Sequence, residues 1–399
     1  MVEKSTNPDF RVKCKSAFVG GMKLKISELG KVITGNTPSK KIKEFWDKDD
    51  VGFVKPDIIS DEHIVKIKSE DCNEFISNAA ISKARIVPKN SIFVTCIGNI
   101  GKIGVATENL AFNQQINAII PNENVNLDYL CYAIFANKTR LQDIANAPIV
   151  PLLNKSQFSE FELEFDMDIN TQTRIVHELN TVSNIILKYK QELLLLDELV
   201  RARFVEMFGD PIENQKDWEV VKIRDIVTDV RYGTSKPAVE GGRYPYLRMN
   251  NLTVDGGLDL SDLKYIDIPD NEIEKCVVRK GDILFNRTNS IDLIGKTSVF
   301  NLLDDMVIAG YIIRIRLNNQ ILPDVFSQYM NLEVMKKVLR GMAKGAVNQA
   351  NINAQELQSI KVYIPDMELQ KQYVEFKEEI DKSRLLSNHS LFLIKSIIF

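Results

Sequence analysis

The spacing of apolar residues predicts two long helices in this chain. Between Thr171 and Phe208, apolar side chains recur in alternating steps of four and three residues, which is the heptad spacing of a coiled-coil seam. The seam residues are Ile175, Leu179, Val182, Ile186, Tyr189, Leu193, Leu196 and Val200. A second helix is expected from Leu369 to Phe399, with a weaker seam formed by Phe376, Ile380, Ile394 and Ile397 and interrupted by Ser383, Ser387 and Ser390. Because an apolar seam needs a partner in water, we expect the two helices to pack on each other.

The rest of the chain shows shorter elements of mixed type. Short runs rich in β-branched residues alternate with turns rich in Gly, Asn and Pro, which is typical of strands. The runs are Ile92–Thr95, Ile116–Ile120, Ile283–Phe285 and Tyr311–Ile315. Residues 126–134 and 322–330 both begin like helices, with an acidic residue in the first turn. The pattern indicates a mixed α/β structure beside the two long helices.

The chain also contains an internal repeat. Five pairs of similar segments keep the same order, and the members of each pair are separated by roughly 190 to 200 residues. The pairs are 24–39 with 221–237, 87–94 with 278–285, 126–134 with 322–330, 153–163 with 352–362, and 171–176 with 369–374. We therefore predict a tandem duplication of one unit of about 200 residues, which is a typical domain size.

Composition adds limits on the class of protein. Hydrophobic residues make up 44% and charged residues 26% of the chain, as in soluble globular proteins, and no apolar run approaches the roughly 20 residues of a membrane span. The five cysteines are scattered and form no C-x-x-C motif, which favours a reducing, cytoplasmic location. The net charge of −3 gives no hint of a nucleic-acid partner. Residues 1–21 read as a poorly ordered extension, and the fold is expected to begin at Met22.

Catalytic motifs are missing from the sequence. No H-E-x-x-H, Walker A or G-x-S-x-G pattern occurs, and the three histidines (His63, His177 and His389) are far apart. No Asn-Pro-Pro-aromatic tetrapeptide of an amino-methyltransferase is present. The glycines between Gly98 and Gly104 fit neither the dinucleotide nor the Walker spacing and are expected to form a turn between strands. We expect no catalysis, metal or cofactor in this chain alone.

Polar loop residues offer the remaining chemistry. Arg, Asn, Lys, Gln and Thr side chains read base edges or bind phosphates, and Arg248, Asn250 and Arg287 are examples in the second half. Two similar modules related by an approximate two-fold axis would suit duplex DNA, which has the same symmetry. The alternative for each such residue is that it caps a turn.

Five segments together resemble a known family, the specificity subunits of type I restriction–modification systems. The segments are 35–59, 91–105, 112–121, 201–211 and 283–296, and the resemblance covers nearly all of residues 22–399. It implies two target-recognition domains that each read half of a split site in double-stranded DNA. It also implies two conserved helices that pack antiparallel, as a spacer and as the docking site for two methyltransferase subunits. Those subunits would bind S-adenosylmethionine, and restriction subunits would join the full complex.

The resemblance gives an α+β fold with five segments and a set of candidate DNA contacts. We expect an extension (1–21), recognition domain 1 (22–168), a central helix (169–210), recognition domain 2 (211–366) and a C-terminal helix (367–399). The candidate contacts are Thr37, Lys40, Lys55, Asn99, Lys102 and Gln114 in the first domain and Tyr232, Thr234, Lys236, Arg248, Asn250, Arg287, Thr288, Asn289, Lys296 and Tyr311 in the second. One departure is expected: where relatives often carry an Arg in the first loop, this chain has Ile97.

Two other functions fit the same residues. The chain could be the specificity subunit of a related restriction–modification system with a different enzyme partner. It could also be a coiled-coil adaptor that binds proteins rather than DNA, and loss of binding in rising salt would favour DNA over this alternative. The missing tetrapeptide and cofactor loop argue against a self-sufficient methyltransferase.

Overall fold

The computed structural model describes residue 18 and residues 21–145, 150–346 and 349–397. The chain divides into two compact units, unit 1 (residues 1–189 with 389–399) and unit 2 (residues 190–388). Most of the expected N-terminal extension lies outside the described residues. Phe18 is described, and its side chain is buried in the core of unit 1.

Unit 1 contains two main sheets. The first has five strands in the order β2-β10-β7-β8-β4, and the second has four in the order β5-β3-β9-β6. The strands of the first sheet are β2 (Gly30–Thr34), β10 (Ile116–Pro121), β7 (Ile92–Thr95), β8 (Ile103–Ala106) and β4 (Val65–Ile67). Those of the second are β5 (Phe75–Ile76), β3 (Val51–Val54), β9 (Leu110–Phe112) and β6 (Ile86–Val87). In the second sheet β3 runs parallel to β9, whereas β5 and β6 are antiparallel to their neighbours.

Unit 2 repeats this topology. Its sheets have the orders β13-β21-β17-β19 and β15-β14-β20-β16, with β14 parallel to β20 and the outer strands antiparallel. The strands are β13 (Val227–Tyr232), β21 (Ile312–Leu317), β17 (Ile283–Asn286), β19 (Thr297–Val299), β15 (Lys264–Ile266), β14 (Tyr244–Leu247), β20 (Met306–Ile308) and β16 (Val277–Val278). The strand order and direction match those of unit 1 except for β4, which has no counterpart in the four-stranded sheet of unit 2, so the predicted internal repeat is confirmed. The four predicted strand runs are also found, as β7, β10, β17 and β21.

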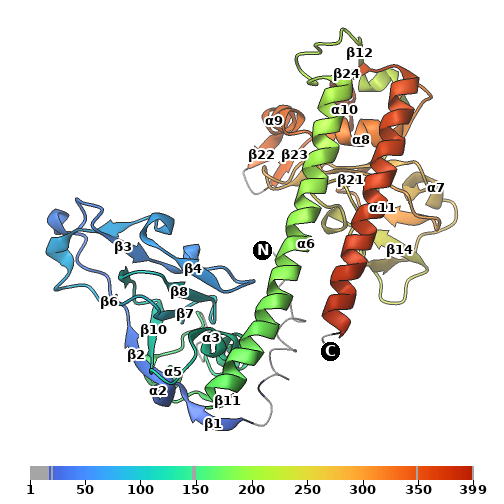
Figure 1. Ribbon diagram of the computed structural model, residues 1–399. Helices are drawn as coiled ribbons and strands as arrows, with labels where there is room; N and C mark the ends of the chain where they lie inside the picture. Colours follow the sequence, from blue (N-terminus) through green and yellow to red (C-terminus); the bar gives the residue numbers. More distant parts are fainter. Residues whose placement is uncertain (1–17, 19–20, 146–149, 347–348, 398–399) are drawn as a thin grey trace. The chain divides into compact units, whose positions relative to one another are not determined.

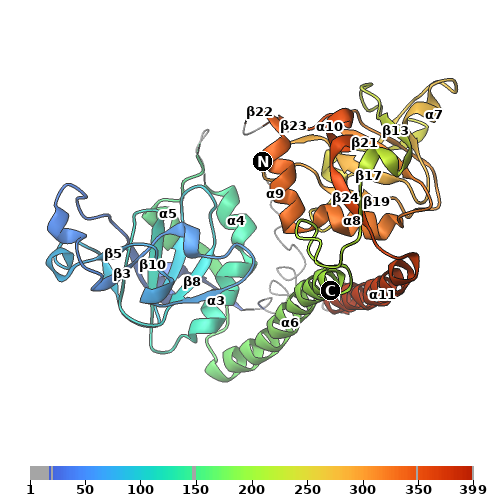
Figure 2. The same cartoon turned by 90° about the horizontal axis from the view of Figure 1, so that it is seen from above.

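Each unit is completed by helices and by a strand pair that precedes its long helix. The pairs are β1 (Met22–Lys25) with β11 (Glu162–Phe165) and β12 (Glu219–Lys222) with β24 (Lys361–Ile364). The matching helices are α3 (Leu127–Ala136), α4 (Lys138–Asp143) and α5 (Lys155–Ser159) in unit 1 and α8 (Pro323–Asn331), α9 (Glu333–Met342) and α10 (Ala354–Ser359) in unit 2. In unit 1, α3 and α4 lie on the side of the unit away from β3 and β5 (Figure 2). Helices α5 and α10 both begin at an Asn whose side chain accepts the backbone N–H three residues later, at 2.9 Å in each case.

Short elements fill the connections. They are α2 (Ile26–Leu29), η1 (Lys43–Phe45), η2 (Pro56–Ile58), η3 (Ser69–Asp71), η4 (Asn78–Ala80), η5 (Ile223–Asp225), η6 (Met249–Asn251), α7 (Ile273–Cys276), β18 (Thr288–Asn289), β22 (Lys344–Ala346) and β23 (Gln349–Asn351). The last three strands form a small sheet in the order β18-β23-β22, which extends from the end of β17.

The two predicted long helices are α6 (Ile169–Phe208) and α11 (Met367–Ile397) (Figure 1). The start of α6 contributes to the core of unit 1 and its end to the core of unit 2. Within unit 2 the helices are antiparallel, because Phe204 contacts Tyr373 whereas the earlier Glu192 accepts a hydrogen bond from the later Ser387. The expected antiparallel packing is therefore confirmed for this part of the pair.

The seam of α6 follows the sequence prediction more closely than that of α11. All eight predicted α6 positions are buried or half-buried. In α11 the inward side chains of unit 2 are Tyr373, Lys377, Ile380, Arg384 and Ser387, whereas Ser383 is exposed. The prediction that small serines fill the middle of this seam is thus confirmed for the buried Ser387 and wrong for the exposed Ser383. Charged side chains stand there because they pair locally: Arg384 with Asp197 and Asp381, and Lys377 with Asp324 and Asp381.

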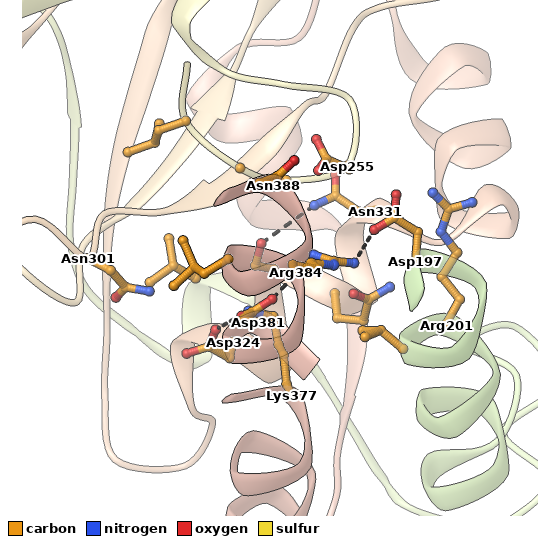
Figure 3. Close-up of a pocket in the computed structure, with 18 of the residues that line it drawn as sticks. Asp197, Arg201, Asp255, Asn301, Asp324, Asn331, Lys377, Asp381, Arg384 and Asn388 are labelled. Carbon is orange, nitrogen blue, oxygen red and sulfur yellow. Dashed lines mark hydrogen bonds and ion pairs between the residues drawn. The ribbon is translucent and has the colours of Figure 1, made fainter. Parts of the chain in front are cut away.

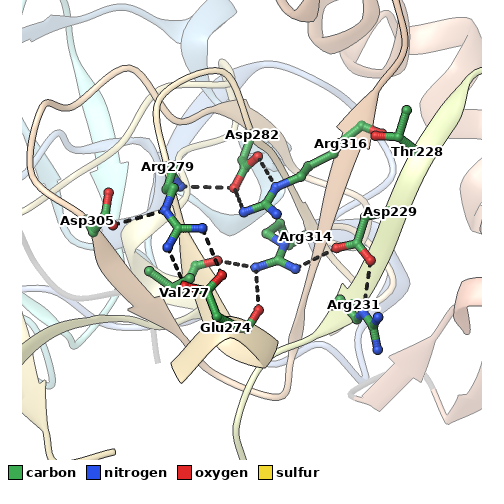
Figure 4. Close-up of polar contacts among 10 residues, drawn as sticks. All are labelled: Thr228, Asp229, Arg231, Glu274, Val277, Arg279, Asp282, Asp305, Arg314 and Arg316. Atoms are coloured by element: carbon green, nitrogen blue, oxygen red, sulfur yellow. Dashed lines mark hydrogen bonds and ion pairs between the residues drawn. The ribbon is translucent and has the colours of Figure 1, made fainter. Parts of the chain in front are cut away.

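An arginine network joins the two sheets of unit 2 (Figure 4). Arg314 on β21 is 1% exposed, and its guanidinium binds the Asp229 carboxylate of β13 and the carbonyl oxygens of Glu274 and Val277. The neighbouring Arg316 pairs with Asp282 at 2.9 Å. A buried guanidinium is tolerated only when its charge is paired, so this network fixes how the sheets pack.

We predict that Asp229→Asn destabilises unit 2 by about 3 kcal/mol at pH 7, because it leaves the buried Arg314 without its counter-charge. Burial raises the pKa of Asp229, but hydrogen bonds from Arg314 and Arg231 outweigh it, and the pKa lies below its usual value. The contribution is therefore present above the unfolded pKa of about 3.9 and is lost as pH falls through the folded pKa. Urea unfolding followed by Trp218 fluorescence, in a Trp46→Phe background, should show the deficit at pH 7 and a smaller one at pH 3.

The control is Glu333→Gln, which breaks an exposed ion pair with Arg340 and should change the free energy of unfolding by less than about 1 kcal/mol. A deficit for Asp229→Asn that is equal at both pH values would contradict the prediction.

Candidate nucleic-acid interface

Each unit has one sheet edge at which polar residues gather, at the carboxyl ends of its parallel strands. In unit 1, Val54 of β3 pairs with Phe112 of β9, so Lys55 and residues 113–114 leave the sheet side by side. In unit 2, Leu247 of β14 pairs with Ile308 of β20, which brings Arg248 beside residues 309–311. Parallel pairing brings these residues together, because two parallel strands end at the same edge of the sheet.

A third segment reaches each edge through a glycine. Gly35 follows β2 and Gly233 follows β13, and the next residues, Asn36 and Thr234, donate backbone hydrogen bonds to the carbonyl oxygens that end β9 and β20. A Cβ atom on either glycine would lie 2.1 Å from a backbone oxygen. Only glycine allows this close approach. The two edges are therefore built in the same way from residues far apart in sequence.

In unit 1 the candidate contacts form two groups. The Thr37 hydroxyl donates to the Gln114 side-chain oxygen at 2.7 Å. Lys55 and Lys40 both donate to the Glu74 carboxylate, at 2.5 and 3.1 Å, and the hydrogen bond from Lys55 holds the pKa of Glu74 below its usual value. The Lys40 ammonium also lies 5.1 Å from the centre of the Trp46 ring. Thr37, Lys40 and Gln114 are exposed, and Lys55 is half-buried.

In unit 2 the cations are also held by carboxylates. Arg248 pairs with Asp262 at 2.7 Å, and Lys264 binds the other oxygen of the same carboxylate at 3.0 Å. Lys236 pairs with Glu272 at 2.9 Å, and its backbone N–H donates to the Thr234 hydroxyl. Asn250 is exposed. Both edges thus carry cations that are neutralised by neighbouring acids.

Arg287 differs from the other arginines of this edge. Its guanidinium lies 4.9 Å from the centre of the Tyr232 ring and donates to the Gly310 carbonyl at 3.4 Å. It forms no ion pair with any residue that the structure describes. Its buried Nε atom, like that of Arg248, has no hydrogen-bond partner there. The Ala354 backbone N–H donates to the Tyr232 hydroxyl oxygen at 2.8 Å, which fixes the ring. Tyr311, 51% exposed, completes this group.

Three candidate residues of the second unit are engaged inside the protein. Thr288 is 8% exposed, and its hydroxyl donates to Asn351 at 2.9 Å. Lys296 is 7% exposed, and its ammonium donates to two backbone carbonyl oxygens. The half-buried Asn289 side chain donates to Asn286. These positions argue against the expected DNA contacts, because the polar groups already have internal partners.

Two candidates of the first unit have similar internal roles. The Lys102 ammonium donates to the Pro56 carbonyl oxygen at 3.1 Å. Asn99 lies half-buried in the loop between β7 and β8, where its side chain hydrogen-bonds Asp61 and its backbone carbonyl accepts from the Thr95 hydroxyl. This loop forms the turn that the glycine spacing predicts, with Gly98 and Gly101 at positive φ.

The counterpart of Arg287 in the first unit is Cys96, not Ile97. The Cys96 backbone N–H donates to the residue before β10, as the Arg287 backbone N–H donates to the residue before β21. Ile97 instead forms a bridge to Leu152 and corresponds to the buried Thr288. Ile97, where relatives were expected to carry an Arg, therefore lies one residue beyond the position in unit 1 that matches Arg287. Cys96 is 3% exposed, so unit 1 has no cation at this place.

Sequence reasoning missed the acids that hold the cations. Glu74 and Asp262 lie just before β5 and β15, the strands that pair with β3 and β14. The cation that pairs with an acid just before a strand cannot be predicted until the strand pairing is known. Trp46 was also missed, although a tryptophan among lysines was a visible signal; it lines a cavity of about 370 Å³ with Lys40 and Glu74.

Unit 2 also has a polar cavity of about 540 Å³ beside its helices (Figure 3). Asp197 of α6 and Arg384 of α11 line one side, and the Gly256–Gly257 turn and α8 line others. Arg384 lies between Asp197 and Asp381 and pairs with both. Since most of the charged side chains that line it are paired within the protein, we interpret the cavity as imperfect packing where these elements of unit 2 meet.

Within the described residues, no group of three or more His, Cys, Asp and Glu side chains could hold a metal ion. Among the same residues, no helix has both the length and the apolar character needed to cross a membrane. Cys72, Cys96, Cys131 and Cys276 are buried free thiols.

Comparison with known proteins agrees with this architecture. The family model of the type I restriction modification DNA specificity domain matches residues 20–195 and again 215–392. The chain is 29% identical over 262 residues to the MjaIX specificity subunit of Methanocaldococcus jannaschii, covering 60% of this chain and 59% of that protein. It is 29% identical over 206 residues to the HindI specificity subunit of Haemophilus influenzae, covering 51% and 39%. The matches therefore span less than two thirds of these curated relatives.

A solved structure extends the similarity to the whole fold. The S subunit of a type I restriction–modification system from M. genitalium superposes with a TM-score of 0.55 at 15% sequence identity, covering 95% of this chain and 94% of that one. A structure from work on complex assembly and conformational transition of the type I system gives a TM-score of 0.51 at 15% identity. At this identity the likeness concerns the fold alone.

Proposed function

The chain belongs to the type I restriction–modification DNA specificity family, and we propose that it selects the DNA target of such a system. The observation that carries the proposal is the pair of equivalent edges, one in each unit, at the ends of β3 and β9 and of β14 and β20. Each edge offers cations and hydrogen-bonding side chains that can bind phosphates and base edges. Two such edges would read the two halves of a split site.

The proposed DNA contacts are those candidates whose polar groups reach the surface. They are Thr37, Lys40, Lys55 and Gln114 in the first domain and Tyr232, Thr234, Lys236, Arg248, Asn250, Arg287 and Tyr311 in the second. The internal bonds of Asn99, Lys102, Thr288, Asn289 and Lys296 remove these five from the set. The recognition domains would be residues 22–168 and 211–366, joined by the helices 169–210 and 367–399.

The helices would dock the enzymatic partners. In unit 2 a group of leucines on α6 and α11 stays exposed: Leu194, Leu195, Leu199, Leu385 and Leu386. Their exposed fractions run from 46% to 69%, and apolar helix surfaces of this kind mark protein–protein contacts. We assign them to two methyltransferase subunits, which would bind S-adenosylmethionine, with restriction subunits completing a cytoplasmic complex. The chain itself would perform no chemistry.

The first test compares the chain alone with the chain plus its methyltransferase subunit. We expect S-adenosylmethionine-dependent methylation of adenines only from the complex, at a split sequence that methylation mapping of the host genome identifies. Methyl transfer by the pure chain would contradict the non-catalytic role. Methylation without sequence preference would contradict the proposed function, as would binding of proteins but no duplex DNA.

A second prediction concerns individual contacts on the target duplex. Arg287→Ala and Arg248→Ala should each weaken binding by about 1–3 kcal/mol, because both cations stand at the proposed DNA-facing edge. Lys55→Ala should weaken binding and reduce the slope of log K against log salt by about 0.9, as expected for one lost phosphate contact. The control Lys222→Ala changes an exposed lysine outside the edge. Equal affinity and equal slope for all variants would move the DNA face elsewhere.

A third prediction tests the docking helices. Leu194→Glu with Leu195→Glu should prevent assembly with the methyltransferase subunit, since charges would enter an apolar contact. The double variant should keep its thermal unfolding midpoint, because both side chains are more than half exposed in the free chain. Size-exclusion chromatography of the mixed subunits measures assembly, and Lys216→Glu serves as the charge control. Normal assembly of the double variant would place the docking surface elsewhere.

A further inference from the structure

We infer that Lys102 and Lys296 are positioning residues for target recognition. Each holds, from inside its own unit, the turn that presents the first cation of the DNA-facing edge. The inference rests on the proposed function and deepens it. It replaces the expected role of these two lysines as phosphate contacts.

The two lysines occupy the same place in the two units. Each follows a glycine with positive φ, 83° at Gly101 and 76° at Gly295, and each precedes a strand, β8 or β19. The carbonyl oxygen of each accepts a hydrogen bond from the last residue of the neighbouring strand: Thr95 to Lys102, and Asn286 to Lys296. The loops before the two lysines differ in length, but the strand pairing shows that the lysines are at equivalent positions.

Their ammonium groups bind the same element. Lys102 donates to the Pro56 carbonyl oxygen at 3.1 Å, and Lys296 donates to the carbonyl oxygens of Met249 and Leu252 at 2.7 and 2.5 Å. Pro56 begins η2 and Met249 begins η6, the short helices that follow β3 and β14. The contact therefore occurs twice, between equivalent atoms, in two halves of the chain whose sequences have diverged.

These turns carry the residues proposed to meet DNA. Lys55 immediately precedes η2, and Arg248 immediately precedes η6, which includes the exposed Asn250. The ammonium binds one side of each turn while the cation before the turn points to the edge. A base contact needs its donor placed to within about 0.5 Å, so a turn that loses its anchor would misplace these groups.

The burial of the Lys296 ammonium explains why it binds the turn. Lys296 is 7% exposed, and burial lowers the pKa of its side chain. An ammonium that has lost its water must find protein acceptors, and here they are backbone carbonyl oxygens of the turn. The same carbonyl oxygens would be left without a donor if the ammonium were removed. The ammonium and the carbonyl oxygens thus each satisfy the other, and their contact holds the turn in one conformation.

The test uses the complex with its methyltransferase subunit and duplexes carrying the mapped target. Lys296→Met and Lys102→Met keep the length of the side chain but remove the donors. For each we would measure affinity for the target and for duplexes with single base-pair changes in either half, at several salt concentrations. Arg248→Ala identifies the half that unit 2 reads, and unit 1 is expected to read the other half. Lys55→Ala is the parent of the double variant with Lys102→Met, and Lys216→Met is the control for an exposed lysine.

We expect Lys296→Met to lower discrimination by about tenfold or more in the half that Arg248→Ala affects, and to leave the other half within about twofold. Lys102→Met should do the same for the half that Arg248→Ala leaves unaffected. Adding Lys296→Met to Arg248→Ala, or Lys102→Met to Lys55→Ala, should leave the salt slope unchanged, because each lysine acts only through the cation of its own turn.

Three results would overturn the inference. One is a slope that falls by a further amount of about 0.9 when the lysine change is added to the change of its cation, which marks a separate phosphate contact. Another is unchanged discrimination, and the third is an equal loss in both halves, which marks general unfolding. If Lys296→Met does not fold, Lys102→Met decides, since that side chain is only half-buried. A wild-type complex without sequence discrimination would instead overturn the proposed function, and the inference with it.

Discussion

The parallel pairing of β3 with β9, and of β14 with β20, is the constraint from which the rest of each unit follows. Antiparallel neighbours would send successive chain ends to opposite edges, whereas a parallel pair delivers two at one edge. The glycine turn after β2 or β13 then brings a third segment there. Everything assigned to DNA recognition depends on this convergence, which local sequence does not reveal.

The sequence alone was enough to predict those features that follow from a regular spacing of residues. The heptad steps of α6, the strands β7 and β17 and the internal repeat follow from spacing alone, and the structure has them. The middle of α11 could not be read in this way, because the inward Arg384 interrupts an apolar pattern and is tolerated only through Asp197. The spacing of apolar residues predicts which apolar side chains are buried, but it does not predict a buried charged side chain that has an ion-pair partner.

Candidate site residues were predictable by type but not by exposure. Lys55 and Lys296 look alike in the sequence, since both follow or precede short strands among polar residues. One side chain reaches the edge of the sheet and the other is buried beneath a turn. The difference arises from strand pairing between segments that are not neighbours in the sequence, so no local pattern could separate them. The misplacement of Arg287's counterpart at Ile97 has the same origin, because loop length hides the register that Cys96 keeps.

The acids that pair with Lys55 and Arg248 would, under the proposed function, compete with DNA for these cations. Glu74 and Asp262 hold the cations in the free chain, and a phosphate or base would have to displace them. A duplex of the wrong sequence would offer too few contacts to complete this exchange and would be released quickly, whereas the correct site would be retained. A chain with a net charge of −3 could in this way sample a large excess of DNA without remaining bound to it.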